Sequence, residues 1–266
     1  MRTDLDTEFF DSPRPRVIAH RGASGLFPEN TFEAFRAADE LHAPYVELDI
    51  HMTADGQIVV VHDPDLRRIS GHPGIISQMA LDELQAIDAA YNFSPDGFAG
   101  YPFRGKGVRV PTLAAVFTRF PHLRFVVEIK QTGPSLVASM LEVIDRATMR
   151  RRVLIASEHQ EPIEEVRALA PRMPTNFARQ DAADFFSAMP LHTHDYVPRG
   201  DALQLPPEYK SLKMITANSV AAAHRIGVEV HVWTINEESA MRAMLALGVD
   251  GIITDYPDRL TRLLNR

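Results

Sequence analysis

The sequence predicts an α/β protein folded as a TIM (β/α)8 barrel with a small insertion after the second strand. Eight short runs of apolar, mostly β-branched residues recur along the 266 residues, and stretches with helical periodicity lie between most of them. Alternation of eight strands with helices is typical of a closed parallel barrel. One interval, at about residues 52–111, interrupts the alternation and contains the insertion.

The predicted strands are RVIAH (16–20), YVELDIH (45–51), RFVVEIK (124–130), VLIAS (153–157), PTNFA (174–178), ALQLP (202–206), VEVHVWT (228–234) and GIITD (251–255). The predicted helices lie at 29–42, 135–149, 161–170, 219–227 and 237–248. The last two end at glycine, which often follows the final turn of a helix. Each predicted helix therefore falls on the connection between two neighbouring strands.

The insertion begins with a predicted hairpin, TADGQIVVVHD (53–63), because Ala-Asp-Gly flanked by apolar residues favours a turn. A Gly- and Pro-rich stretch with little helical periodicity follows it. We interpret the whole chain, 1–266, as a single barrel domain. The insertion then decorates the barrel mouth and is not an independent domain.

The composition limits the classes of function. With 45% hydrophobic and 24% charged residues, the chain can bury a full core. Its net charge of −7 argues against a sequence-independent nucleic-acid binder, which needs clustered Lys and Arg. The absence of cysteine excludes disulfides, thiolate nucleophiles and zinc–thiolate sites. A metal ion would therefore have to bind to oxygen or imidazole ligands.

The sequence also indicates where the protein resides. Its first residues, MRTDLDTEFFDSPRPR, carry acids throughout and include no apolar run of signal-peptide length. No stretch approaches the roughly 20 apolar residues that cross a bilayer. We expect a cytoplasmic protein without stable membrane insertion, and the sequence leaves its oligomeric state open.

Two acids lie on one face of the predicted second strand. Residues two apart in a strand point the same way, so Glu47 and Asp49 face one side while their apolar neighbours face the other. The apolar side belongs against the helices, which places both carboxylates inside the barrel, near the mouth where active sites of such barrels lie. The alternative is that these acids pair with buried arginines.

The third strand repeats this pattern with Glu128 and Lys130 on one face. Three converging carboxylates repel one another unless a cation lies between them. Ligation by oxygen alone favours one divalent cation, Mg²⁺ or Ca²⁺, with Mn²⁺ as a third option. Lys130 has two compatible interpretations, a phosphate contact or an ion pair with a neighbouring acid.

Two histidines follow predicted strands. His20 ends the first strand and is followed by Arg21 and Gly22, at the end of a barrel strand that delivers functional residues. His62 follows the apolar run IVVV. Imidazole serves as acid or base near neutral pH, and the Arg21 guanidinium matches phosphate oxygens. Either histidine considered alone is more often structural.

The only tryptophan, Trp233, shares a face of the seventh strand with His231. Its ring would either line the pocket and contact substrate or pack as plain core. The chain has no Walker-type loop, no GxGxxG and no GxSxG. These absences argue against nucleotide binding and a serine triad.

Taken together, HRGASGLFPENTFEAF, VELDIHMTADGQIVVVHD, VVEIK, VHVWTIN and GVDGIITDYP resemble the glycerophosphodiester phosphodiesterase family, from about residue 16 to residue 258. The resemblance implies a TIM barrel with a small insertion after the second strand. It also implies metal-dependent hydrolysis of a small-molecule glycerophosphodiester to glycerol 3-phosphate and an alcohol.

Carried over by motif, the resemblance assigns three kinds of role. The metal ligands are Glu47, Asp49 and Glu128, the acid–base pair is His20 and His62, and the phosphate contacts are Arg21 and Lys130. One departure lies at HDPDLRRISG (62–71), where Ile69 replaces a hydroxyl residue that the family often has. The insertion should therefore govern which alcohol is released.

The sequence leaves two alternatives to this function open. The same site on a related barrel would serve a lysophospholipase D or a phospholipase-like phosphodiesterase. Aromatic side chains of the insertion would then line a lipid entrance, or else cap the core: Tyr91, Phe93, Phe98, Tyr101 and Phe103. The third interpretation is a catalytically silent barrel that binds a polyol phosphate or a partner protein, and the complete set of acids and histidines argues against it.

Overall fold

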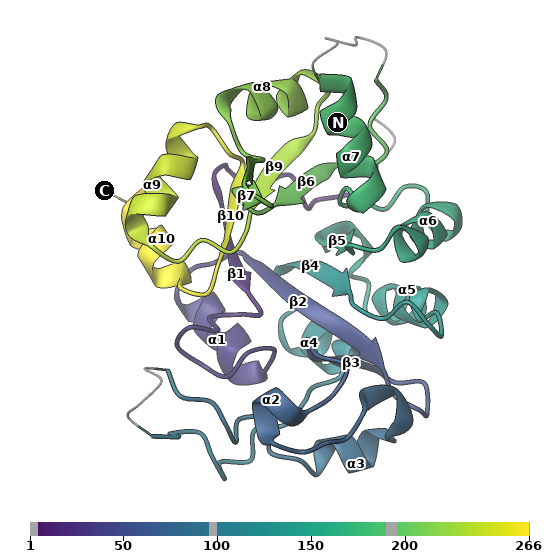
Figure 1. Ribbon diagram of the computed structural model, residues 1–266. Helices are drawn as coiled ribbons and strands as arrows, with labels where there is room; N and C mark the ends of the chain where they lie inside the picture. The colour runs from purple at the N-terminus through teal and green to yellow at the C-terminus, as the bar shows by residue number, and fades with distance from the viewer. Residues whose placement is uncertain (1–4, 96–99, 190–195, 266) are drawn as a thin grey trace.

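Seven parallel strands lie side by side in the order β5, β4, β2, β1, β10, β9 and β6 in the computed structural model, which describes residues 5–95, 100–189 and 196–265 (Figure 1). Their bounds are β1 (Arg16–His20), β2 (Tyr45–Met52), β4 (Arg124–Ile129), β5 (Val153–Ala156), β6 (Ala202–Leu205), β9 (Glu229–Val232) and β10 (Gly251–Thr254). All seven coincide with predicted strands, within two residues at either end.

The remaining predicted strand, 174–178, closes the ring between β5 and β6. Thr175 forms a parallel bridge with Ile155, and Asn176 forms one with Ala202. The segment is too irregular to count as a strand, and Pro174 at its start cannot donate to a ladder. Its carbonyl instead accepts a hydrogen bond from Ile155 N at 3.0 Å. The barrel prediction is therefore confirmed, with one side of the ring held by isolated bridges.

Helices cover the outside of the ring (Figure 1). The five predicted helices are present as α1 (Phe32–Glu40), α5 (Val137–Arg146), α6 (Gln160–Leu169), α8 (Ala217–Arg225) and α9 (Glu238–Ala246). The remaining helices of the ring are α4 (Leu113–Arg119), α7 (Arg179–Ala188) and α10 (Pro257–Leu264), and the short η2 (Arg150–Arg152) precedes β5. Beyond α8 and α9, Gly227 and Gly248 adopt φ of 73° and 81°, the left-handed geometry that ends helices.

The interval after β2 contains the predicted hairpin, with β3 (Ile58–Val60) antiparallel to β2 and Gly56 in the turn at φ 80°. Short elements follow: α2 (Arg67–Ser70), η1 (Ile76–Gln78) and α3 (Leu81–Gln85). These elements have a small hydrophobic cluster of their own, built around residues such as Leu66, Ile76 and Leu84.

A second hairpin, which the sequence did not indicate, lies between β6 and α8. It consists of β7 (Glu208–Tyr209) and β8 (Leu212–Lys213), which pair antiparallel. Its two turn residues, Lys210 and Ser211, have φ of 46° and 66°, a conformation usually left to Gly, Asn or Asp. The absence of a glycine signal explains why the turn was missed.

Side-chain alternation along β2 divides the molecule into an outer and an inner layer. Val46, Leu48 and Ile50 belong to the large cluster between strands and helices. Tyr45 belongs to a separate cluster inside the ring, and Glu47 and Asp49 share its face. The predicted inward orientation of both acids is thus correct. Among the described residues, no helix is long and apolar enough to cross a membrane.

Candidate active site

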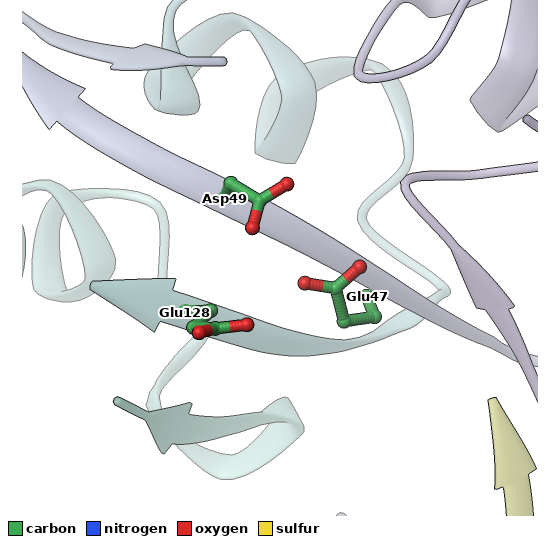
Figure 2. A group of neighbouring side chains, drawn as sticks. All are labelled: Glu47, Asp49 and Glu128. Carbon is green, nitrogen blue, oxygen red and sulfur yellow. The ribbon is translucent and has the colours of Figure 1, made fainter. Parts of the chain in front are cut away.

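Three carboxylates from two neighbouring strands converge inside the barrel (Figure 2). Glu47 and Asp49 come from β2 and Glu128 from β4, and the strand register sets Asp49 directly beside Glu128. One oxygen from each of the three lies within 4.8 Å of the others. Glu47 is 3% exposed and Asp49 is fully buried. The sequence prediction of one acidic cluster is therefore reproduced in space.

Burial and mutual repulsion perturb the acids of this cluster. Burial, followed by the charge of Asp49, raises the pKa of Glu47 from 4.5 to about 8. Burial also raises the pKa of Glu128. Burial would raise the pKa of Asp49 too, but the cations of Lys130 and Arg21 hold it below its usual value. Without a further cation, the surroundings therefore do not stabilise all three acids in the ionised form.

Three neighbours contact the cluster without fully satisfying it. Lys130 Nζ lies 2.7 Å from Glu128 Oε1 and 3.2 Å from Asp49 Oδ1. Asn30 Nδ2 donates to Asp49 Oδ2 at 2.8 Å, and the backbone N–H of Arg21 donates to Glu47 Oε2 at 2.9 Å. The ion-pair interpretation of Lys130 is thus observed.

Two buried carboxylate oxygens of the cluster, Glu47 Oε1 and Asp49 Oδ1, accept no hydrogen bond from the described residues, although Asp49 Oδ1 lies 3.2 Å from Lys130 Nζ. A buried oxygen without a hydrogen-bond partner costs free energy. Oxygen ligands on opposite sides of one Ca²⁺ lie about 5 Å apart, so the cluster has the spacing that a single cation bridges. The donor set, three carboxylates and no sulfur, fits a hard divalent cation.

His20 lies at the edge of the acidic cluster and is held by Asp255, the residue after β10. A carboxylate only accepts, so Nδ1 of His20 carries the proton in its 2.6 Å hydrogen bond to Asp255 Oδ1. Ser24 and Asn236 donate to the same carboxylate at 2.8 and 2.6 Å. Nε2 of His20 then faces the cluster, 3.9 Å from Glu47.

Despite burial, the hydrogen bond to Asp255 and the charge of Glu47 raise the pKa of His20. Burial would raise the pKa of Asp255 in turn, but the hydrogen bond from His20 lowers it to about 2. The pair therefore favours a charged carboxylate that fixes both the tautomer and the orientation of the imidazole.

His62, which follows β3, has the same arrangement with its own carboxylate. Its Nδ1 lies 2.7 Å from Asp63 Oδ1. Arg68 of α2 donates to Asp63 at 2.6 Å and forms two further hydrogen bonds, 2.6 and 2.7 Å long, to Glu29. Glu29 in turn accepts from Arg21 at 3.0 Å. A continuous chain of ion pairs thus connects His62 to the loop that follows β1.

The site opens into a cavity of about 660 Å³. The polar part of its lining includes His20, Arg21, His62 and Lys130, which surround the acidic cluster. Trp233 lines the cavity and also packs against the apolar cluster inside the ring, and its contact with substrate stays a prediction. All eight predicted site residues except Asp49 line this cavity, and Asp49 is buried behind it.

The described aromatic residues of the insertion do not border the cavity, in contrast to the expectation that they line a lipid entrance. Phe103 packs edge-on against Phe27 and Phe93, each at 5.7 Å. Tyr91 and Tyr101 pack against the guanidinium of Arg104, and none of these rings borders the cavity. Phe98 lies outside the described residues.

Within the described part of 52–111, only His62 contributes to the cavity lining. The apolar lining comes from α7, from the hairpin β7–β8 and from strand residues such as Val126, Leu205 and Ile253. Apart from His62, the insertion reaches the site through the contacts of Arg68 with Asp63 and Glu29. This geometry does not support control of the released alcohol by the lining residues of the insertion.

Several polar residues of the site were not found from the sequence. Asp255 ends the last predicted strand, and Asp63 directly follows His62, so both had a positional signal. Asn30, Asn236 and Arg68 lie on loops or short helices, and only the folded ring brings them together.

Comparison with known proteins gives a consistent result. The model of the glycerophosphoryl diester phosphodiesterase family matches residues 20–259. A glycerophosphodiester phosphodiesterase of Caldanaerobacter subterraneus subsp. tengcongensis is 32% identical over 255 residues, covering 94% of this chain and 98% of that protein. A lysophospholipase D of Mus musculus is 26% identical, covering 94% and 86%. The crystal structure of a glycerophosphodiester phosphodiesterase from Agrobacterium tumefaciens has the same fold, with a TM-score of 0.74 at 23% identity, covering 93% and 99%.

Proposed function

Because the chain belongs to the glycerophosphoryl diester phosphodiesterase family, we propose that it hydrolyses glycerophosphodiesters to glycerol 3-phosphate and an alcohol with the help of one divalent cation. The chain is a phosphoric diester hydrolase. The observation that supports the detailed proposal is the convergence of three carboxylates and two carboxylate-held histidines on one cavity.

Glu47, Asp49 and Glu128 would hold the cation, which we expect to be Mg²⁺ or Ca²⁺, with Mn²⁺ as a third option. When bound, the cation supplies positive charge that stabilises the negative charge on the phosphate oxygens in the transition state. With a cation in the site, Glu47 would stay ionised at neutral pH, because positive charge beside a carboxylate favours its charged form.

His20 and His62 would carry out the proton transfers. Each imidazole is fixed through Nδ1 by a carboxylate, which leaves Nε2 available to the cavity. One Nε2 removes a proton from the attacking hydroxyl while the other donates a proton to the leaving oxygen. Both routes, attack by water and attack by the glycerol 2-hydroxyl, use the same pair.

Three further residues would bind the substrate. Arg21 and Lys130 border the cavity beside the carboxylates, where a phosphate would lie. Both cations are paired with acids, so phosphate binding must share them with those acids. The ring of Trp233 offers an apolar surface in the cavity lining.

The proposed reaction is tested by release of glycerol 3-phosphate from a panel of glycerophosphodiesters, each assayed with Mg²⁺, Ca²⁺, Mn²⁺ or a chelator. We expect turnover with at least one cation and none with the chelator. The matched variants His20→Ala and His62→Ala should lose about 10² to 10⁴ in rate. A variant lacking both histidines that retains the wild-type rate would refute the acid–base assignment.

A second substrate class is favoured by two observations. The cavity has an extended apolar side, and one relative is named a lysophospholipase D. A lysophospholipid carries its acyl chain on the glycerol. Comparison of glycerophosphocholine with lysophosphatidylcholine in one assay separates the two classes, and a strong preference for the lysophospholipid would replace the glycerophosphodiester assignment.

A further inference from the structure

Part of the cavity lining, contributed by α7 and the segment around β8, is apolar. Phe186 of α7, Leu212 of β8 and Met214 just after β8 belong to it. Their side chains offer no strong hydrogen-bond donor or acceptor. This surface, which we name the apolar wall, is continuous with the catalytic side, so one ligand can contact both.

The hairpin β7–β8 holds its part of the wall in a fixed position. Tyr209 and Leu212 are directly paired across the hairpin, and Met214 N donates to Pro207 O at 2.9 Å. Leu212 is nevertheless 66% exposed and Tyr209 51% exposed, although both border the cavity. An apolar side chain held at a cavity mouth and only partly covered gains stability when a ligand covers it.

Charged groups near the wall do not make it a polar subsite. Arg179 of α7 pairs with Glu158 at 3.2 Å, and both side chains are more than half exposed. Lys213 borders the cavity but is exposed, so its ammonium reaches solvent. A neutral apolar group is therefore the ligand that matches this wall.

The two sides of the cavity orient a diester. The glycerol half of the substrate carries two hydroxyl groups, which need hydrogen-bond partners when they leave water. Carboxylates, Arg21 and Lys130 provide such partners on the catalytic side, whereas the apolar wall provides none. The glycerol half therefore stays beside the acids, and the other arm of the phosphate extends toward the apolar wall.

We propose that the apolar wall of Phe186, Leu212 and Met214 binds an apolar chain on the leaving alcohol, so that the preferred substrates are glycerophosphodiesters of amphiphilic alcohols. This inference rests on the proposed function and adds the chemical class of the alcohol. The cavity volume of about 660 Å³ lies within the range of pockets that enclose ligands much larger than glycerol phosphate.

A homologous series of glycerophospho-n-alkanols, from ethanol to octanol, tests the proposal. Release of glycerol 3-phosphate gives kcat/KM for each member below its micelle concentration. For the wild type we expect kcat/KM to rise by about two- to fourfold per added methylene, because each buried methylene contributes transfer free energy.

Leu212→Ser should flatten the dependence of kcat/KM on chain length. The loss of kcat/KM relative to wild type should therefore grow with chain length. Leu212→Phe, which keeps the surface apolar, should retain most of the slope. The matched control is Leu169→Ser at the end of α6, where a leucine of similar exposure, 56%, lies away from the cavity lining. This control should keep both the rates and the slope of the wild type.

The outcomes separate the inference from the function on which it rests. Turnover with a flat or falling dependence on chain length overturns the inference and leaves the proposed function standing. A different result would overturn the inferred orientation. Lysophosphatidylcholine, which carries its chain on the glycerol, would have a higher kcat/KM than the octanol diester and would show the largest loss of kcat/KM in Leu212→Ser. Absence of turnover for every member contradicts the proposed function, and the inference with it.

Discussion

Asp255 Oδ1 lies 2.6 Å from Nδ1 of His20, which joins the loop after β10 to the end of β1. The two strands are neighbours in the ring, with Ala19 in register with Thr254. Asp255 is itself fixed by Ser24 and Asn236. The orientation of a proposed acid–base residue thus depends on a carboxylate that lies 235 residues further along the chain.

Asp255→Asn should lower kcat by about 10²-fold or more, because an amide can bind the imidazole in the wrong tautomer and no longer stabilises its charged form. KM should change little, since Asp255 does not face the cavity lining. Steady-state kinetics with glycerophosphocholine measures both constants. Asp82→Asn, an exposed acid on α3, is the control and should behave as wild type. A wild-type kcat in Asp255→Asn would contradict the positioning role.

Arg68→Gln should lower kcat about tenfold, because Arg68 fixes Asp63 behind His62 and also holds Glu29 beside Arg21. Arg68→Lys should recover part of the rate, since a lysine keeps the charge but not the fork geometry. The neighbouring Arg67 is exposed and has the same charge, so Arg67→Gln is the matched control. Equal rates for the two glutamine variants would show that the ion-pair chain has no catalytic effect.

Thermal unfolding should depend on pH through Glu47. Its pKa is raised from 4.5 to about 8, first by burial and then by Asp49, so its contribution to stability is fully present below pH 4.5 and is lost as the pH rises through about 8. In the presence of a chelator, the Tm of the wild type should therefore fall across this interval, and Glu47→Gln should lack most of the fall.

The exposed Glu161 provides the control, because Glu161→Gln should keep the wild-type pH dependence of Tm. A divalent cation competes with the proton for Glu47, so its addition should raise Tm more at about pH 8 than at about pH 5. If Glu47→Gln in chelator shows the same fall of Tm with pH as the wild type, Glu47 is not the cause of that fall.

Glu128→Gln should weaken binding of the divalent cation, because a neutral amide oxygen replaces one of three charged ligands. Isothermal titration calorimetry measures the affinity for the cation directly. We expect it to fall about tenfold or more, because one of the metal ligands is weakened. The control is Glu165→Gln on α6, which is outside the cluster of Glu47, Asp49 and Glu128. Unchanged affinity in Glu128→Gln would remove this residue from the metal site.

Strand periodicity made the acidic cluster predictable from the sequence. Because residues two apart share a face, Glu47 and Asp49 had to face the same way once β2 was recognised, and Glu128 followed by the same rule. Their convergence also required the two strands to be neighbours, which the barrel supplies. The two histidines were found because each follows a strand.

The remaining site residues depend on contacts between distant segments, which periodicity does not encode. Asp255 contacts His20 only because β10 closes the ring against β1. The apolar wall depends on a hairpin whose turn, Lys210 and Ser211, lacks the glycine that usually marks such turns. Without that signal, the sequence directed the expected control of the released alcohol to the insertion rather than to this hairpin.

The central claim is that Glu47, Asp49 and Glu128 hold the cation on which diester hydrolysis depends. Its most direct test is the initial rate of glycerol 3-phosphate release from glycerophosphocholine while the cation is titrated into chelator-treated protein, for wild type and for Glu128→Gln. We predict that the treated wild type has a rate about 10³-fold or more below its maximum, that the cation restores it, and that the variant needs a higher cation concentration. Full activity of the treated wild type, or identical titration curves for the two proteins, would contradict the claim.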